Sequence, residues 1–209
     1  MAKSACWIWL LAFGTAQAAA QASAPGPLEA VRSSNERVRS ILAGRETIDP
    51  HTEEALFAAI DEATDIGLIS RRATEAFRSR LTGAEYAELD GTFRELLRKS
   101  SLRKLGRYRA DRFEYVDEEI RGDTALVRTM AFYEAESVRL DYRMERIAGR
   151  WMIVDYIVDD VETVRNYRKQ FIRLFAANDT AGVIRRLKAK IAEIDEERGV
   201  AKDPGAERR

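Results

Sequence analysis

The sequence predicts an α+β fold, in which a mainly helical first part is followed by an antiparallel sheet of at least four strands. Apolar residues recur at intervals of three and four positions across residues 28–105, which is helical spacing. Across residues 112–158 they mostly alternate with polar residues, the pattern of half-buried strands. Helices that precede a run of strands are typical of the α+β class.

The first three helices are expected within residues 28–80. The first ends at Gly44, because glycine readily adopts the left-handed conformation that closes a helix. The second covers residues 51–63 and the third about residues 65–80. Each has an apolar face that should pack against the rest of the fold. These faces consist of Leu28, Val31, Val38 and Ile41 or Leu42, then Leu56, Phe57 and Ile60, and finally Ile66, Ile69, Ala73 and Phe77.

A fourth helix is expected to begin at Thr82. Thr82 and Glu85 match a capping box, in which each side chain accepts a hydrogen bond from the backbone N–H of the other residue. Apolar residues continue at helical spacing as far as Leu105, so this helix should be long. Its expected buried residues are Tyr86, Leu89, Phe93, Leu96 or Leu97, Leu102 and Leu105.

Four strands are expected after these helices. They cover residues 112–120, 124–133, 138–145 and 151–158. A short turn with a glycine separates the first two strands, and another, at Gly149, separates the last two; glycine can take the positive φ that such turns require. The strands therefore form successive antiparallel hairpins.

The fourth strand is apolar on both faces except for Asp155. A strand covered on both faces is expected in the interior of a sheet. Residues 159–160 are both aspartate and should end it.

Two more helices are expected at the end of the chain. Apolar residues from Val161 to Phe175 step at helical spacing and predict the first of them. The segment at residues 178–180 offers a cap for the second, over residues 181–197. Residues 199–209 contain proline and glycine and should form a frayed tail.

Three short motifs occur in a fixed order in the second half of the chain. They are LDYR at residues 140–143, then Gly149, Trp151 and Asp155, and then NYRKQF at residues 166–171. In these motifs and their spacing the chain resembles the periplasmic phospholipid-binding MlaC family, also called the toluene-tolerance family. The resemblance covers about residues 28–190. It implies a curved, NTF2-like antiparallel sheet with packed helices, a helical subdomain and a lipid cavity between them.

The resemblance also implies a function. It implies a soluble, monomeric carrier that holds phospholipid acyl chains. The carrier would move lipid between an inner-membrane ABC transporter complex and an outer-membrane lipoprotein complex, and so support the lipid asymmetry of the outer membrane. Such a carrier needs no cofactor and no catalytic residue. Inward-facing apolar residues then become candidates for the cavity lining: Leu97, Leu105, Met130, Leu140, Tyr142, Met152, Val154, Tyr156, Val158, Tyr167 and Phe171.

The chain departs from the family at two places. The family usually continues its last strand as Glu-Gly-Val-Ser, where this chain has DDVE at residues 159–162. It usually has a glycine and a tryptophan near Glu75 and Arg78, which are absent here. These departures leave room for a different lipid, such as a hopanoid.

The N-terminus has the features of an export signal. Lys3 precedes an apolar run at residues 6–13, and small residues follow at 16–18 and 22–24, where cleavage is expected. The apolar run is much shorter than the ~20 residues that span a bilayer. We therefore expect a cleaved signal peptide and a periplasmic protein. The expected organisation is a signal peptide at 1–24, a lipid-binding domain at 25–198 and a flexible tail at 199–209. Within the domain, residues 28–108 should be mainly helical, residues 109–159 should form the sheet, and residues 160–198 should again be helical.

Composition excludes several function classes. The 209 residues contain 35 basic and 35 acidic side chains, so there is no strongly basic balance of the kind that nucleic-acid binding favours. The chain has one cysteine, Cys6, which lies in the signal peptide, so the exported part has no disulfide. With one histidine, His51, a zinc site of Cys/His type is excluded and a Ser-His-Asp triad would depend on that residue alone.

Asp155 is the ionisable residue with two open interpretations. NTF2-like folds include enzymes with an acidic base in the cavity, so Asp155 could be catalytic. Alternatively it is structural, and pairs with backbone donors of the following helix or with Arg128, Arg143 or Arg168, because a buried carboxylate needs a partner. A third interpretation of the chain is an interaction module with a filled core and no cavity.

Overall fold

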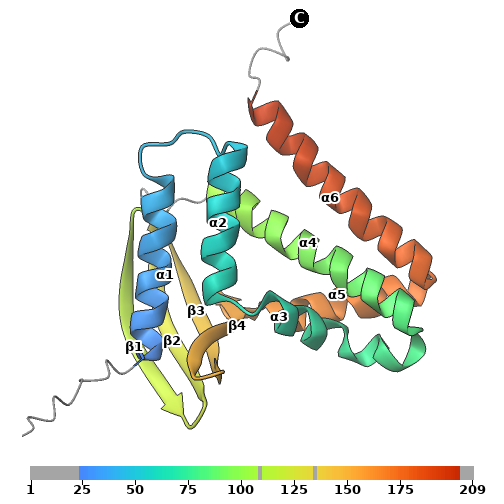
Figure 1. Cartoon of the computed structure of the whole chain (residues 1–209), viewed down its shortest axis with the longest axis horizontal. Coiled ribbons are helices and arrows are strands. Elements are labelled where there is room, and N and C mark those ends of the chain that lie inside the picture. The colour runs from blue at the N-terminus through green and yellow to red at the C-terminus, as the bar shows by residue number, and fades with distance from the viewer. Residues whose placement is uncertain (1–23, 108–109, 134–135, 203–209) are drawn as a thin grey trace, which may run out of the picture.

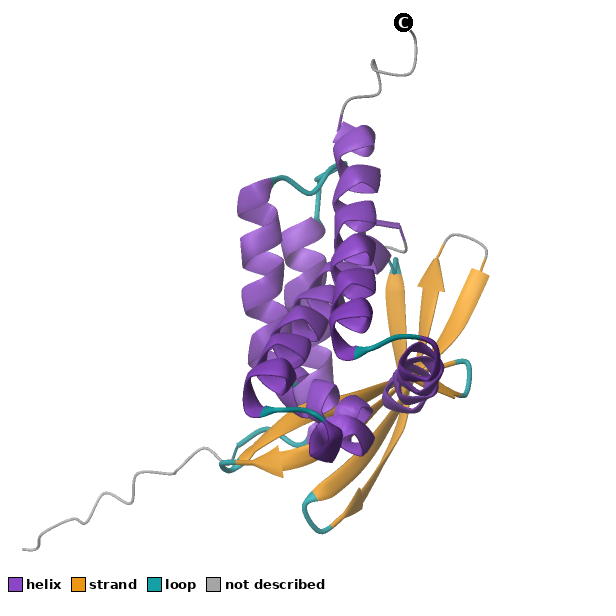
Figure 2. Ribbon diagram, turned by 90° about the vertical axis from the view of Figure 1, so that its right-hand side faces the viewer, coloured by secondary structure: helices purple, strands orange, loops and turns teal. Residues whose placement is uncertain are grey.

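The computed structural model describes residues 24–107, 110–133 and 136–202. Residues 1–23, which hold nearly all of the predicted signal peptide, lie outside the described residues. The described part is an α+β fold, as the sequence predicts. Most helices lie on one side of a twisted antiparallel sheet, and one helix is seen end-on in front of the strands (Figure 2).

The first half of the chain is helical, with a change of helix type in the third helix. Thr64 and Asp65 separate the second helix from the third, and Asp65 caps the third by accepting from the Leu68 N–H at 2.7 Å. The predicted helix over residues 65–80 tightens into a 3-10 helix for its last six residues. The elements are α1 (Pro27–Leu42), α2 (Pro50–Ala63), α3 (Ile66–Thr74), the 3-10 helix η1 (Glu75–Arg80) and α4 (Gly83–Arg107).

The capping box of α4 forms as predicted. The Thr82 N–H donates to Glu85 Oε2 at 2.8 Å, and the Glu85 N–H donates to Thr82 Oγ1 at 3.2 Å. These reciprocal bonds satisfy two N–H groups that have no partner within the helix. The Thr82 hydroxyl also donates to Glu85 Oε2 at 2.7 Å, and this bond, together with the Thr82 N–H, lowers the pKa of the Glu85 carboxyl.

The sheet is an antiparallel meander in the order β1-β2-β3-β4-β5. Gly122 and Gly149 both have positive φ in the turns that the sequence predicts. Ala148 joins Gly149 with positive φ, which is the conformation of a two-residue hairpin turn. The strands are β1 (Arg112–Arg121), β2 (Thr124–Tyr133), β3 (Glu136–Ile147), β4 (Arg150–Val158) and β5 (Val161–Glu162).

The expected interior position of β4 is only partly correct. β4 pairs with β3 along its length, but with β5 at two positions only, Ile157–Glu162 and Val158–Val161. Its burial comes instead from α2, α3 and α5, which all pack against it. An apolar strand near the sheet edge is thus covered by helices rather than by a neighbouring strand.

A β-bulge interrupts the pairing of β3 with β4 and changes which side chains face the helices. Arg143 pairs with Asp155, whereas the next residue, Met144, pairs with Ile153. Val154 is therefore an extra residue in β4. As a result, Tyr156 and Val158 share a face with Ile153, whereas regular alternation would have placed Met152 there.

The chain ends with α5 (Thr163–Ala177) and α6 (Thr180–Lys202). Val161, predicted as the start of a helix, instead lies in β5 and is exposed. Asp179 caps α6 by accepting from the Gly182 N–H at 2.7 Å, as expected for the segment 178–180. The helix extends to Lys202, whereas the sequence predicted its end near Glu197.

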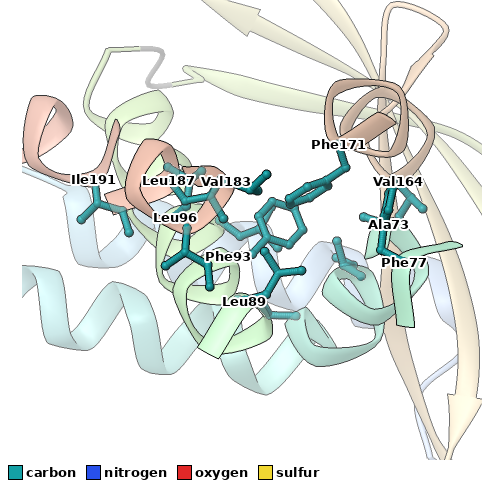
Figure 3. Packing of buried hydrophobic residues seen from close by; sticks show 14 of the residues in the cluster. Ala73, Phe77, Leu89, Phe93, Leu96, Val164, Phe171, Val183, Leu187 and Ile191 are labelled. Carbon is teal, nitrogen blue, oxygen red and sulfur yellow. The ribbon is translucent and has the colours of Figure 1, made fainter. Parts of the chain in front are cut away.

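Two large hydrophobic clusters separate the fold into two packing regions. One joins α3, α4, α5 and α6, and Phe171 stands at its centre beside Phe93, with ring centroids 4.8 Å apart (Figure 3). The other joins α1 to the inner face of the sheet through Val31, Tyr142 and Met144. α1 and α2 run side by side in front of the sheet, and α4 and α6 form the helical body beyond them (Figure 1).

Candidate functional site

A cavity of about 1060 Å³ lies between the sheet and the helices. Its walls come from α1, the α2–α3 junction, the C-terminal half of α4, strands β1 to β4 and the first turns of α5. This volume is at the upper end of the ~300–1,000 Å³ that ligand pockets usually have. The cavity borders both hydrophobic clusters, so neither cluster fills the space between them.

Most of the exposed surface inside the cavity is apolar. The apolar side chains come from helices and strands that are far apart in the sequence, so that the cavity depends on the complete fold. They are Val38, Leu42, Ile60, Ile66, Ile69, Leu97, Leu105, Phe113, Val138, Leu140, Ile153 and Val158. A wall of this kind favours an apolar ligand, because the ligand replaces water against apolar side chains.

Polar groups within the cavity wall bond to one another. The Tyr142 hydroxyl donates to Asn35 Oδ1 at 3.1 Å, and the hydroxyls of Tyr156 and Thr64 are 2.6 Å apart. The rings of Tyr142 and Tyr156 meet edge to face, with centroids 5.7 Å apart. Burial raises the pKa of both phenols, so both stay neutral at physiological pH. These pairs satisfy buried polar groups and leave the wall without a charge in this region.

Charged and hydroxyl side chains gather around the end of the cavity where α1 and α4 end. α4 contributes Ser100, Ser101 and Lys104, and α1 contributes Arg39 and Ser40. Nearby protein atoms partly desolvate the exposed Lys104 ammonium group and lower its pKa, and the neighbouring Arg103 lowers this pKa further. The cavity therefore has an apolar interior and a polar rim.

A family model described as MlaC protein matches residues 32–189, which is more than half of the chain. The chain belongs to the MlaC family. This confirms the resemblance that the three sequence motifs carry.

One solved structure gives an independent comparison for this MlaC-family fold. The chain is similar to a phospholipid-binding protein from Ralstonia solanacearum that was solved in complex with a phospholipid. The TM-score is 0.72 at 18% sequence identity, and the similarity covers 82% of this chain and 99% of that chain. At this identity the similarity establishes a shared fold. No curated protein matches the chain.

The structure brings most of the predicted lining residues of this MlaC-family protein together. They come from α4, β3, β4 and α5, and all of them border the cavity: Leu97, Leu105, Leu140, Tyr142, Tyr156, Val158 and Tyr167. Tyr167 lies in the NYRKQF motif, and burial raises the pKa of its phenol. That motif thus supplies a side chain to the cavity wall.

The β-bulge explains two predicted lining residues that lie elsewhere. Met152 and Val154 were placed on the same face as Tyr156 by regular alternation. Because Val154 is the extra residue of the bulge, Met152 turns to the opposite face and Ile153 takes its place in the cavity wall. Val154 is completely buried, outside the cavity lining.

Met130 and Phe171 also lie outside the cavity. In β2 the buried positions are Ala125, Val127, Thr129 and Ala131, so Met130 is on the other face of the sheet. Phe171 points into the helical core, where its ring contacts Phe93 (Figure 3). Amphipathic patterns identify a buried face, but they do not distinguish a packed core from a cavity wall.

The prediction missed lining residues from the first three helices. Val38, Ile60, Ile66 and Ile69 border the cavity, although their pattern indicated only helix faces that pack in a core. Asn35 is also missed, and its only signal was a polar residue on the buried face of a helix. Local periodicity cannot show which of these faces leaves space in front of it.

Asp155 has a structural role in the fold. It is 5% exposed and lies outside the cavity lining. Its Oδ1 atom accepts the Val164 N–H at 3.0 Å, at the start of α5, which is one of the predicted partners. Burial nevertheless raises its pKa. The arginines proposed as partners bond elsewhere: Arg128 to Asp117 and Glu119, Arg143 to Glu162, and Arg168 to the carbonyl of Arg72.

Asp141 and Arg143 behave differently from each other. Arg143 is exposed and forms an ion pair with Glu162 at 2.8 Å, as expected for a residue on the polar side of the sheet. Alternation along β3 would place Asp141 on the same polar side, but it is 1% exposed, and its carboxylate pairs with Arg139 at 2.9 Å.

The described part of the chain contains neither a metal-ligand cluster nor a membrane-spanning helix. No group of three or more His, Cys, Asp and Glu side chains is placed there to hold a metal ion. Nor is any helix in that part long and apolar enough to cross a bilayer. His51 is exposed near the start of α2, away from the cavity lining.

Proposed function

We propose that this protein is a periplasmic carrier that holds the acyl chains of a phospholipid in the cavity between its sheet and its helices. The observation that carries the proposal is the cavity of about 1060 Å³ with a mostly apolar wall. If a methylene group takes roughly the ~30 Å³ of a water molecule in the liquid, this space accepts on the order of 35 carbon atoms. That matches two acyl chains of common length.

The energy of acyl-chain burial supports the same function. Burial contributes about 0.8 kcal/mol per methylene group, so about thirty groups represent on the order of 20 kcal/mol before the cost of ordering the chains. A lipid does not cross an aqueous compartment alone at a useful rate. A protein cavity removes this barrier without any reactive group, which agrees with the position of Asp155 outside the cavity.

Membership of the MlaC family supports the compartment and the partners. The export signal at residues 1–24 would direct the domain at residues 25–198 to the periplasm. There a monomer would exchange lipid with an outer-membrane lipoprotein complex and an inner-membrane ABC transporter complex. The phospholipid bound to the similar Ralstonia solanacearum protein supports the class of ligand.

A transfer assay tests the carrier function. The exported protein is loaded with an isotope-labelled phospholipid and mixed with inner-membrane vesicles that contain or lack the ABC transporter complex. We expect the label to enter the vesicles several times faster when the complex is present. Equal transfer to both kinds of vesicle would overturn the proposed partner, and a protein that accepts no phospholipid would overturn the carrier function.

A further inference from the structure

Polar side chains join the cavity wall in the C-terminal half of α4, where Leu105 still contributes an apolar one. Leu97 borders the interior, Ser100 and Ser101 follow one turn later, and Lys104 lies one further turn toward the C-terminal end of the helix. Because a helix rises by about 1.5 Å per residue, Lys104 lies roughly 10 Å along the axis from Leu97. An amphiphile bound along this wall would have its polar end beside Lys104.

Lys104 differs from its basic neighbours on α4. Lys99 pairs with Asp195 at 2.6 Å, and Arg103 pairs with Glu197 at 3.5 Å, both on α6. Lys104 forms neither an ion pair nor a side-chain hydrogen bond with any residue that the structure describes. Surrounding protein atoms remove part of the hydration of its ammonium group, and this lowers its pKa. The side chain of Lys104 is nevertheless exposed, so its ammonium group is accessible at the rim to an anion that a ligand supplies.

Arg39 places a second cation at the same rim. Its Nη2 atom donates to the backbone carbonyl of Asp111 at 2.6 Å, which fixes the guanidinium group at the cavity wall. Arg39 forms no ion pair within the described ranges. The remaining N–H groups of a guanidinium can bind two phosphate oxygens in parallel.

Acidic residues at the rim determine what kind of anion can bind. Glu36, Asp111, Glu136 and Asp159 also border the cavity. Their charges disfavour a small free anion. A phosphate group attached to buried acyl chains is held at the rim at high effective concentration, so its contact with Lys104 does not depend on long-range attraction.

We propose that Lys104, assisted by Arg39, binds the phosphate of the lipid whose acyl chains fill the cavity. The cargo is then a lipid with a phosphate-containing head group, rather than a neutral polycyclic lipid such as a hopanoid. This inference rests on the proposed carrier function, and it names the chemical group that the rim recognises.

The test compares two lipids that differ only in the phosphate head group. Dissociation constants are measured for dioleoyl phosphatidylglycerol and dioleoylglycerol with the delipidated exported protein, by displacement of a fluorescent fatty acid. The wild type should prefer the phospholipid. Lys104→Met should reduce this preference about tenfold, as expected for loss of a charge-assisted hydrogen bond, without weakening dioleoylglycerol binding.

Two variants serve as controls. Lys104→Arg keeps the charge and should retain most of the preference. Lys169→Met removes an exposed lysine of α5 that does not border the cavity, and should leave the preference unchanged. An unchanged preference in Lys104→Met, or a wild type that binds both lipids equally, would overturn the phosphate contact and leave the carrier function standing. A wild type that binds neither lipid would overturn the carrier function itself.

Discussion

At the scale of single residues, the sheet offers a matched pair of positions for testing the cavity. Leu140 and Met130 are both half-buried apolar residues in strands, but only Leu140 borders the cavity. Leu140→Glu should therefore reduce bound lipid several-fold, since an acyl chain would have to pack against a carboxylate. The measurement is lipid occupancy by native mass spectrometry, together with urea unfolding.

Met130→Glu is the control for this prediction. It introduces the same charge on the other face of the sheet, so it should affect folding stability at least as much but keep the lipid. If both variants lose lipid equally at similar stability, the assignment of Leu140 to the lipid site is wrong.

Asp155 gives a prediction about pH dependence. Burial raises its pKa in the folded protein above the ordinary aspartate value of 3.8. The folded state therefore binds this proton more tightly than the unfolded state does. The stability that results is fully present below pH 3.8 and is lost as the pH rises through the folded pKa. The Asp155→Asn side chain does not ionise, so the variant does not lose this stability as the pH rises. Its amide oxygen can still accept the Val164 N–H.

Asp155→Asn should therefore gain free energy of unfolding relative to the wild type as the pH rises from about 4 to 7. Urea unfolding of both proteins across this range measures the difference. A difference that moves in the opposite direction would mean that the ionised carboxylate stabilises the fold and that its pKa is lowered.

At the scale of elements, the start of α4 depends on the capping box of Thr82 and Glu85. Thr82→Ala removes the oxygen that accepts the Glu85 N–H. It should cost about 1 kcal/mol of stability, which thermal unfolding at fixed pH can measure. Thr82→Ser keeps the acceptor and should cost much less, whereas equal losses in both variants would contradict a role for the capping bond.

Elements with strong local signals could be predicted from the sequence, and elements that depend on strand pairing could not. The capping box and the glycine turns depend on neighbouring residues, so the boundaries of α4 and of the hairpins follow from local chemistry. The bulge at Val154 has no local signal, because it is defined by the register between β3 and β4. Because of this single extra residue, Ile153 borders the cavity at the place where regular alternation predicted Met152.

The break between α5 and β4 illustrates the same limit. Val161 fits the helical spacing of the residues that follow, yet it pairs with Val158 in the short strand β5. Asp159 and Asp160 both take positive φ, which turns the chain back along β4 before α5 begins. The two-residue strand depends on this turn, which apolar periodicity does not describe.

At the scale of the whole molecule, the cavity is a property of the assembled layers. α1 and α2 cover the sheet, α3 to α6 pack together with α3 and α5 against β4, and the two hydrophobic clusters leave a space between them (Figure 1). Each wall is an ordinary amphipathic helix or strand. Only the space between the layers distinguishes a cavity from a packed core, and the sequence predicted a cavity through family resemblance alone.

The central claim is that this cavity holds a phospholipid in the cell. The most direct measurement is mass spectrometry of the protein purified from a bacterial periplasm without detergent, under native and denaturing conditions. We predict a native mass that exceeds the denatured mass by about one phospholipid, which is identified among the released small molecules. A ligand-free protein that also binds no added phospholipid would contradict the account.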